Sequence, residues 1–359
     1  MRLVKFMDMA YAFKCGQVMR HFLRWAGFLV PYMFLLLPIN SVQAAASGGL
    51  FVLHSAYAPN FDPDLLKQSY LRGIALQIGW RDIEPQEGQY QWQRIDEMVA
   101  IAQREKKMVT IHILPLRPPE WLFAAGAQAF SFTVNNPDSP QSGRTVREVV
   151  PWDAVYLAKW ANMLKHFGER YNANPSVFAV SVTAPMPEMV LPGSYPQHTE
   201  AYQRISGIYN RTAYLAAWKK MIAAYQEFFP DKYKFIAPGI VLDDYQFCDE
   251  VVQYGYQKFG KKLMVFNAGL RAVLPAVFPP MVHIYSLLKE YGGKSNLGFQ
   301  TIWSATNDPR NRLQGSLKDT LNNAVQMGAS YVEVYEADVK NPALQAELVS
   351  AARALRDLH

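Results

Sequence analysis

Short apolar runs alternate with amphipathic segments along almost the whole chain after residue 47, and this alternation most constrains the fold. Short runs rich in aliphatic residues are typical of buried strands, whereas the longer segments have helical periodicity. The expected strands cover residues 50–54, 74–79, 108–114, 177–183, 235–241, 263–267, 297–303 and 330–335. The expected helices cover residues 94–107, 152–171, 202–229, 245–259, 281–291, 317–327 and 343–358. One continuous series of this kind predicts an α/β fold, a single-domain (β/α)₈ TIM barrel.

A doubly wound open sheet is the alternative architecture for such a series. No Gly-rich phosphate loop follows any of the expected strands, which disfavours it. Residues 130–144 are rich in Asn, Ser, Pro and Gly and are expected to form an irregular loop after the third strand. In a barrel, that loop belongs to the face where active sites lie.

The first residues have the pattern of a secretory signal peptide. Arg20 and Arg24 precede an apolar run at residues 25–38, and cleavage is expected after Ala44 or Ala46. An apolar run of roughly 14 residues is too short for a comfortable membrane span. The sequence therefore predicts a soluble exported protein, secreted or periplasmic, without stable membrane insertion after cleavage. An uncleaved anchor is the alternative.

The expected leader is residues 1–46, and the barrel domain is residues 47–359. Met19 would open a leader of ordinary length, so Met1 and Met19 are both candidate starts. Five of the 36 basic and one of the 30 acidic residues fall in the leader, which leaves the remainder a net charge of +2. A nearly neutral domain gives no argument for nucleic acid as a partner. Cys248 is the one cysteine after the leader, which excludes an intramolecular disulfide.

The most informative segment follows the second expected strand. Its spaced residues are Trp80, Ile83, Glu84, Pro85, Gly88, Tyr90, Trp92, Ile95 and Asp96. This spacing resembles the strand-two loop of the clan A glycoside hydrolases, retaining (β/α)₈ enzymes that include β-galactosidases and endoglycanases. Residues 119–122, with Trp121, resemble the Pro-x-Trp-Leu turn of several of those families. The resemblance implies a carbohydrate substrate and no cofactor.

The same segment has a reading from its residues alone. Pro85 and Gly88 impose a turn, and Tyr90 and Trp92 are expected to pack into the layer beneath it. For Trp80 and Arg81, sugar binding and a structural role are both open.

Glycoside hydrolysis generally needs two carboxyl groups, of which one has a raised pKa and protonates the leaving oxygen. The resemblance implies an acid/base Glu after strand four and a nucleophilic Glu at the end of strand seven. Glu188 is the one carboxylate between strand four and Glu200, which makes it the expected acid. A solvated loop residue is the alternative for Glu188.

Strand seven departs from the clan pattern because it contains no Glu. Gln300 lies there, and a neutral amide cannot act as a covalent nucleophile. The replacement is expected on strand eight, where the two-residue period turns Glu333 toward the barrel interior. Glu336 is the alternative if the strand ends in a bulge, and a structural Glu333 bonded to Arg or Tyr is also open. Strands four and eight lie nearly opposite, so the stereochemical outcome stays open.

Aromatic and polar side chains near the expected strand ends are candidates for contact with sugar. The expected substrate-binding residues are Trp80, Arg81, His112, Trp121, Gln300, Trp303, Tyr335 and Glu336. His54 and His112 would orient hydroxyl groups. No His-x-His or His-x-x-x-His spacing indicates a metal site, and no Gly-x-Ser-x-Gly turn indicates a nucleophilic serine.

The sequence therefore predicts an exported glycoside-hydrolase-like enzyme that acts on a poly- or oligosaccharide, with Glu188 and Glu333 as catalytic carboxyl groups. The alternative is a barrel that has lost its nucleophile and binds exopolysaccharide. A structural role in assembly of the cell envelope is a third reading. Oligomeric state is not indicated by the sequence.

Overall fold

The structure is a computed structural model that describes residues 48–56, 58, 60–135, 142–189, 191, 199–276, 279–355 and 357. The expected signal peptide, residues 1–46, lies outside the described residues. Within the described part of the chain, no helix is both long and apolar enough to cross a membrane.

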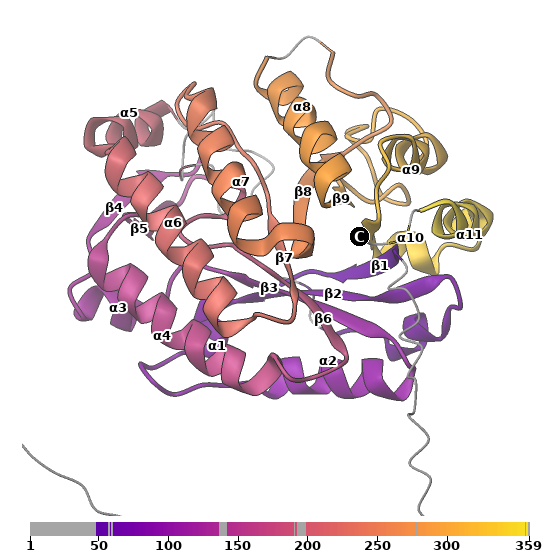
Figure 1. The fold of residues 1–359 in the computed structure, drawn as a ribbon, viewed down its shortest axis with the longest axis horizontal. Coiled ribbons are helices and arrows are strands. Elements are labelled where there is room, and N and C mark those ends of the chain that lie inside the picture. Colours follow the sequence, from indigo (N-terminus) through magenta and orange to yellow (C-terminus); the bar gives the residue numbers. More distant parts are fainter. Residues whose placement is uncertain are drawn as a thin grey trace, which may run out of the picture. The chain divides into compact units, whose positions relative to one another are not determined.

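Eight parallel strands close into a barrel, which confirms the predicted fold (Figure 1). The neighbours around the barrel run β1-β10-β9-β8-β7-β6-β3-β2. The strands are β1 (Gly49–His54), β2 (Leu71–Gly79), β3 (Met108–Leu114), β6 (Val177–Ser181), β7 (Tyr233–Ile236), β8 (Leu263–Leu270), β9 (Asn296–Thr301) and β10 (Tyr331–Tyr335). Sequential neighbours therefore pair around the ring, and β10 pairs with β1 to close it.

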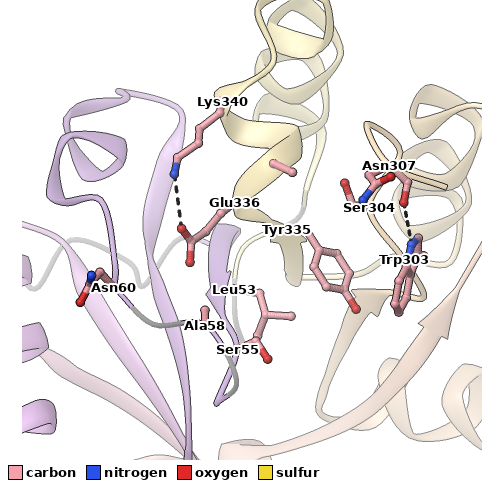
Figure 2. Close-up of a pocket in the computed structure, with 11 residues that line it drawn as sticks. Leu53, Ser55, Ala58, Asn60, Trp303, Ser304, Asn307, Tyr335, Glu336 and Lys340 are labelled. Atoms are coloured by element: carbon pink, nitrogen blue, oxygen red, sulfur yellow. Dashed lines mark hydrogen bonds and ion pairs between the residues drawn. The ribbon is translucent and has the colours of Figure 1, made fainter. Parts of the chain in front are cut away.

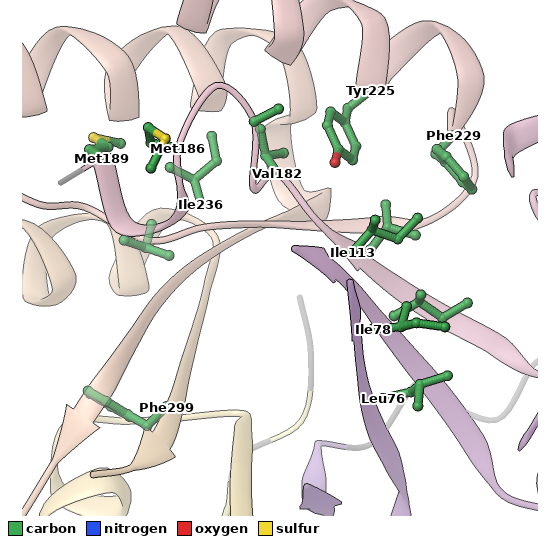
Figure 3. Packing of buried hydrophobic residues seen from close by; sticks show 14 of the residues in the cluster. Leu76, Ile78, Ile113, Val182, Met186, Met189, Tyr225, Phe229, Ile236 and Phe299 are labelled. Atoms are coloured by element: carbon green, nitrogen blue, oxygen red, sulfur yellow. The ribbon is translucent and has the colours of Figure 1, made fainter. Parts of the chain in front are cut away.

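Alternate residues of each strand point to opposite sides of the barrel wall, which explains the two separate apolar clusters. The inner cluster fills the barrel and includes Phe51, Phe235, Met264, Phe266 and Tyr331. The outer cluster packs the other face of the strands against the helices (Figure 3). The strands are thus apolar on both faces, as a parallel sheet covered by helices requires.

Helices surround the barrel, and several short helical turns lie in the loops (Figure 1). The longer helices are α2 (Gln93–Arg104), α4 (Ala154–Tyr171), α5 (Thr199–Ile208), α6 (Arg211–Phe228), α7 (Tyr245–Phe259), α8 (Pro279–Lys294), α9 (Leu317–Gln326) and α11 (Gln345–Ala354). The short ones are α1 (Trp80–Ile83), α3 (Glu120–Ala124), α10 (Glu336–Lys340), and the 3-10 turns η1 (Pro63–Lys67), η2 (Pro187–Met189), η4 (Gly260–Lys262) and η5 (Pro342–Leu344).

The single helix expected over residues 202–229 is wrong, because the chain breaks it into α5 and α6. Asn210 lies between them in an extended conformation, and its side chain accepts a hydrogen bond from the Ala213 amide. Asn is a favoured N-cap because its short side chain satisfies a free amide of the first turn.

The loop expected at residues 130–144 is a strand over its first four residues, 130–133. It contributes to an antiparallel hairpin of β4 (Ala129–Thr133) and β5 (Thr145–Val149), inserted between β3 and α4. The fifth strand of the barrel, β7, ends at Ile236 rather than at the expected residue 241. Ala237 and Pro238 follow it, and proline has no amide hydrogen to donate to the sheet.

Lys234 on β7 is fully buried between the strand and the end of α6. Its ammonium group donates to the carbonyl oxygens of Phe229 and Lys232, at 2.9 Å each, and lies 5.0 Å from the Phe259 ring centroid. Carbonyl groups at a helix end lack helical partners, so a cation there is stabilising. Burial nevertheless lowers the pKa of Lys234 to about 7.

Because of Lys234, the free energy of unfolding should depend on pH in the alkaline range. Its pKa is about 7 in the folded protein and 10.5 in the unfolded chain, so the unfolded chain binds more protons between these values. The free energy of unfolding of the wild type, relative to Lys234→Met, should therefore rise by on the order of a few kcal/mol between pH 7 and 10. Urea denaturation across this range measures it. Exposed Lys220→Met is the control and should keep the wild-type slope; the same slope in Lys234→Met would contradict the assignment.

Candidate active site

Two cavities open near the carboxyl ends of the barrel strands. The first has a volume of about 440 Å³ and lies at the ends of β1, β9 and β10 (Figure 2). Its lining comprises Leu53, Ser55, Ala58, Asn60, Trp303, Ser304, Asn307, Tyr335, Glu336, Ala337 and Lys340. This volume falls in the range of about 300–1,000 Å³ that is usual for small-molecule sites.

The second cavity is smaller, about 80 Å³, and lies over the barrel interior. Its lining comprises Gln77, His112, Leu114, Ser181, Val182, Thr183, Pro187, Glu188, Phe235, Ala237, Phe266, Ala268 and Gln300. The amide of Gln300 lies 3.5 Å from the hydroxyl of Tyr335, which connects the lining of one cavity with the lining of the other.

Glu188 lies in the short turn η2 after β6 and lines the second cavity. Its backbone has a φ of 53°, an uncommon conformation for a non-glycine residue. Burial raises the pKa of the Glu188 carboxyl group above its ordinary value. A carboxyl group in this setting retains its proton to higher pH than a solvated one, which suits proton donation.

Glu333 does point toward the barrel interior, but it does not reach either cavity. Its side chain is fully buried and lines neither of them. Oε1 accepts a hydrogen bond from the Tyr331 hydroxyl at 2.8 Å, and His112 Nε2 lies 2.8 Å from the same oxygen. The expectation that Glu333 contacts substrate is therefore wrong, because His112 lies between it and the second cavity.

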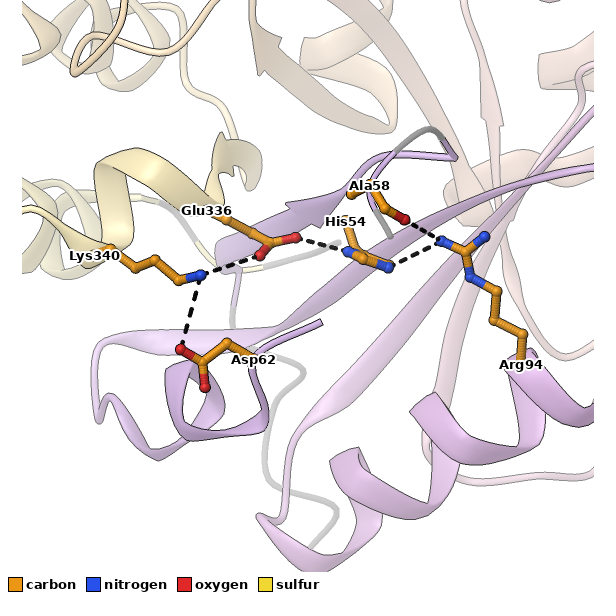
Figure 4. A network of polar contacts seen from close by, with 6 residues as sticks. All are labelled: His54, Ala58, Asp62, Arg94, Glu336 and Lys340. Atoms are coloured by element: carbon orange, nitrogen blue, oxygen red, sulfur yellow. Dashed lines mark hydrogen bonds and ion pairs between the residues drawn. The ribbon is translucent and has the colours of Figure 1, made fainter. Parts of the chain in front are cut away.

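Glu336, directly after β10, is the carboxylate that reaches a cavity. It is the first residue of α10, directly after the strand, and lines the first cavity. Glu336 Oε1 lies 2.7 Å from His54 Nδ1, and Oε2 lies 3.7 Å from Lys340 Nζ (Figure 4). Arg94 Nη2 lies 3.0 Å from the other ring nitrogen of His54. Because a guanidinium can only donate, His54 Nε2 accepts and Nδ1 donates to Glu336.

Trp303 and Tyr335 line the same cavity as Glu336. Trp303 is 36% exposed, and its indole donates to the carbonyl oxygen of Asn307 at 2.7 Å, which fixes the ring (Figure 2). The Trp303 and Tyr335 ring centroids lie 6.1 Å apart. An exposed, anchored indole beside a hydroxyl-bearing ring offers both an apolar surface and a polar edge to a ligand.

Trp80 is not a sugar platform, contrary to that expectation, because none of its surface is exposed. Its ring packs edge-on against Trp121 and Trp160, with centroids 5.6 and 5.1 Å away. Trp121 is partly buried, and its indole nitrogen donates to the backbone carbonyl oxygen of Glu84 at 2.8 Å. Arg81 lies on α1 with its side chain exposed. Trp121 and Arg81 also line neither cavity.

The segment after β2 is a clamp that holds the loop to the helix layer. Glu84 is 2% exposed, and its carboxylate accepts from the Trp80 indole and the Gly88 amide at 2.8 Å each. Farther along, the Tyr90 hydroxyl bonds to Asn162 of α4 at 3.1 Å. The structural role expected for Tyr90 is thus supported by its contact with the next helix.

Gln77, Ser181 and Glu148 are among the residues of the carboxyl face that had no role in the sequence analysis. Gln77 and Ser181 face the second cavity from β2 and β6. Their inward register follows from the two-residue period of each strand, the signal that could have found them. Glu148 on β5 is buried, accepts from the Arg117 amide at 3.3 Å, and has its pKa raised by burial to about 7. Its strand lies just beyond the loop expected at residues 130–144, where no strand was expected.

Removing the Glu84 carboxylate should destabilise the fold. Glu84→Ala leaves the buried Trp80 indole and the Gly88 amide without their acceptor, at a cost of about 2–4 kcal/mol in the free energy of unfolding. The control is Glu87→Ala in the same loop. Glu87 is half exposed and pairs with Lys159, so its loss should cost under about 1 kcal/mol. Chemical denaturation measures both, and equal losses would contradict a clamp centred on Glu84.

Known proteins resemble this chain in sequence pattern and in fold. A family described as beta-galactosidase matches residues 61–234, just under half of the chain. No curated protein matches the sequence. The structure is similar to the β-galactosidase of the psychrophilic Marinomonas ef1, with a TM-score of 0.55, 13% identity, and coverage of 85% of this chain and 59% of that one.

Two further solved structures show the same fold. The β-galactosidase of the Antarctic haloarchaeon Halorubrum lacusprofundi has a TM-score of 0.55 and 13% identity, and the match covers 85% of this chain and 57% of that one. An endo-β-1,4-glucanase of Xanthomonas axonopodis pv. citri has a TM-score of 0.51 and 10% identity, with 85% and 99% covered. The chain spans less than two thirds of either β-galactosidase. This chain is therefore a closed (β/α)₈ barrel, similar in fold to solved glycoside hydrolases, and its residues 61–234 match a family described as beta-galactosidase.

Proposed function

We propose that this protein is an exported glycosidase that cleaves O-glycosidic bonds in a poly- or oligosaccharide at the carboxyl face of its barrel. The observation that carries the proposal is the presence of two carboxyl groups, Glu188 and Glu336, that line two neighbouring cavities and differ in environment. Glycosidases divide acid and base roles between two carboxyl groups in this way.

Glu188 serves as the general acid. Burial raises its pKa, so its protonated form persists nearer to neutral pH than that of an ordinary Glu. The proton would pass to the oxygen of the leaving sugar as the glycosidic bond breaks.

Glu336 is the second carboxyl group. Its Oε1 accepts a hydrogen bond from His54 Nδ1 at 2.7 Å, and the Lys340 ammonium lies 3.7 Å from its Oε2, so two partners hold the carboxylate in place. A carboxylate that faces the sugar can act as a nucleophile or as a base toward water. Arg94 and His54 act as positioning residues, because they orient Glu336 rather than touch the ligand.

The first cavity accommodates the sugar. Its volume of about 440 Å³ suits a sugar ring, and the exposed indole of Trp303 provides a flat apolar surface for the C–H face of the ring. The amides of Asn60 and Asn307 and the hydroxyl of Tyr335 are available for sugar hydroxyls along the same wall.

Export is the part of this proposal that rests on sequence alone. The order of basic, apolar and small residues before residue 47 supports it, because this order directs a chain into a secretory route. An exported glycosidase would meet polysaccharide outside the cytoplasm.

A second candidate function is binding of exopolysaccharide without hydrolysis. The feature that favours it is Gln300 on β9, at the strand where the clan resemblance implies a nucleophilic Glu. In this case, the aromatic wall of the first cavity would be retained while the chemistry is lost.

Hydrolysis of a glycan library by the purified protein, with reducing-end detection, separates the two functions. Glu188→Gln and Glu336→Gln should each lower kcat by about 10²- to 10⁴-fold, because each removes one proton-transfer or charge-stabilising group. Trp303→Ala should raise KM with little change in kcat, because it removes binding that ground and transition states share.

Glu169→Gln, an exposed carboxylate on α4, is the matched control and should leave the rate unchanged. A wild-type protein that hydrolyses no glycan, yet binds one through Trp303, would favour the binding function. Full activity in Glu188→Gln would exclude the proposed acid.

A further inference from the structure

The barrel interior contains a serine, a histidine and a glutamate in series. Ser181 Oγ lies 2.5 Å from His112 Nδ1, and His112 Nε2 lies 2.8 Å from Glu333 Oε1. The three residues come from β6, β3 and β10, so no local sequence pattern indicates them. Arrangements of this kind are recognised by geometry and roles and not by order along the chain.

The ends of the series differ in exposure. Ser181 and His112 line the second cavity, where they can meet a ligand, while Glu333 is fully buried behind His112. A nucleophile and a base at a cavity, supported by a buried carboxylate, have the order that nucleophilic catalysis requires. Neither Ser181 nor Glu333 has this role in glycoside hydrolysis by Glu188 and Glu336.

The contacts of the Glu333 carboxylate differ between its two oxygens. Tyr331 donates to Glu333 Oε1 at 2.8 Å, which leaves Oε1 as an acceptor and fixes the carboxylate. The Glu333 Oε2 atom has no hydrogen-bond partner among the described residues, and His112 Nε2 meets Oε1 at ion-pair distance without a hydrogen-bond angle. The resting contact is thus electrostatic, and catalytic hydrogen bonds commonly tighten only when substrate binds. A buried carboxylate is costly unless a positive charge forms beside it, and a protonated His112 would supply that charge.

We propose that Ser181 is an acyl-accepting nucleophile and that this barrel also hydrolyses short-chain O-acyl esters. Ser181 Oγ forms a bond to the acyl carbon while its proton passes to His112 Nδ1. The ester C–O bond then breaks, and that proton leaves with the alcohol. Water attacks the acyl-serine, gives a proton to His112 and releases the carboxylic acid, and the same proton restores the Ser181 hydroxyl. The sum is ester plus water to acid plus alcohol.

The second cavity fits a short acyl group. Its volume of about 80 Å³ is well below that of a usual small-molecule site, and Phe235, Phe266 and Ala268 form much of its apolar wall. The side-chain amides of Gln77 and Gln300 line the same space, and their contacts there are long, 3.4 and 3.5 Å. Loosely held amide donors can turn toward the negative oxygen of a tetrahedral intermediate.

The alcohol part of the ester would extend into the larger first cavity, past Gln300 and Tyr335. An O-acetylated sugar has this shape, with a small acyl group on a ring of hydroxyls. That choice of alcohol rests on the proposed carbohydrate function, whereas the acyl chemistry does not.

A fluorophosphonate probe tests the nucleophile directly, because it forms a covalent bond only with an activated serine. The purified wild-type protein should be labelled on Ser181, as located by peptide mass spectrometry, and should hydrolyse p-nitrophenyl acetate. Ser181→Ala should abolish both, with kcat/KM lowered at least about 1,000-fold. Ser176→Ala is the matched control, since Ser176 precedes the same strand at the opposite end of the barrel, and it should keep both activities.

Glu333→Gln separates positioning from a general loss of structure. Because Glu333 lines neither cavity, this variant should lower kcat while KM for p-nitrophenyl acetate stays close to the wild-type value. p-Nitrophenyl butyrate and octanoate should be progressively poorer substrates in the small cavity.

Absence of probe on Ser181 in folded wild-type protein would overturn the proposal, as would ester hydrolysis that survives in Ser181→Ala. The ester assay does not depend on Glu336, so Glu336→Gln should retain it. A wild-type protein that hydrolyses p-nitrophenyl acetate but no glycan would therefore contradict the glycosidase alone, and a wild-type protein that hydrolyses a glycan but no ester would contradict the esterase alone.

Discussion

The pairing of β1 with β10 is the interaction on which both cavities depend. It closes the barrel in parallel register, with Gly49 opposite Tyr331 and Leu53 opposite Tyr335. That register brings the end of the first strand beside the end of the last, so His54 meets Glu336 across nearly three hundred residues of sequence. The same closure encloses the interior in which Glu333 and His112 meet. An open sheet of the same strands would separate His54 from Glu336 and His112 from Glu333.

Much of the fold follows from periodicity in the sequence. A strand with apolar residues on both faces must be covered on both, and eight such strands in series have few ways to satisfy this other than a closed barrel. Departures arose where a single residue changes the local geometry. Asn210 caps a new helix inside an apparently continuous amphipathic stretch, and Pro238 follows the strand that was expected to continue through it. Such residues act by making or removing individual hydrogen bonds, which an average over a window conceals.

The sequence predicted which side chains point toward the barrel interior, but not which of them are buried. The two-residue period turned Glu333 inward correctly, yet it could not show that His112 covers it. Trp80 lies directly after a strand end, where contact with a ligand is common, but the chain enters α1 there and the indole turns into the helix layer. The long segment after β2 that carries the sequence resemblance therefore contributes to packing. The chemistry lies in residues that no spacing connects, such as Ser181 and His112, because only the closed barrel brings them together.

The hairpin of β4 and β5 has a small apolar core of its own, made by Phe132 and Val134 with Phe130 and Val146 packed against them. Its strands hydrogen-bond to each other and not to the barrel sheet. Changes in the length or composition of this excursion therefore leave the pairing of the eight barrel strands intact. The hairpin is therefore the part of this face of the barrel where an insertion or a grafted segment should be tolerated best.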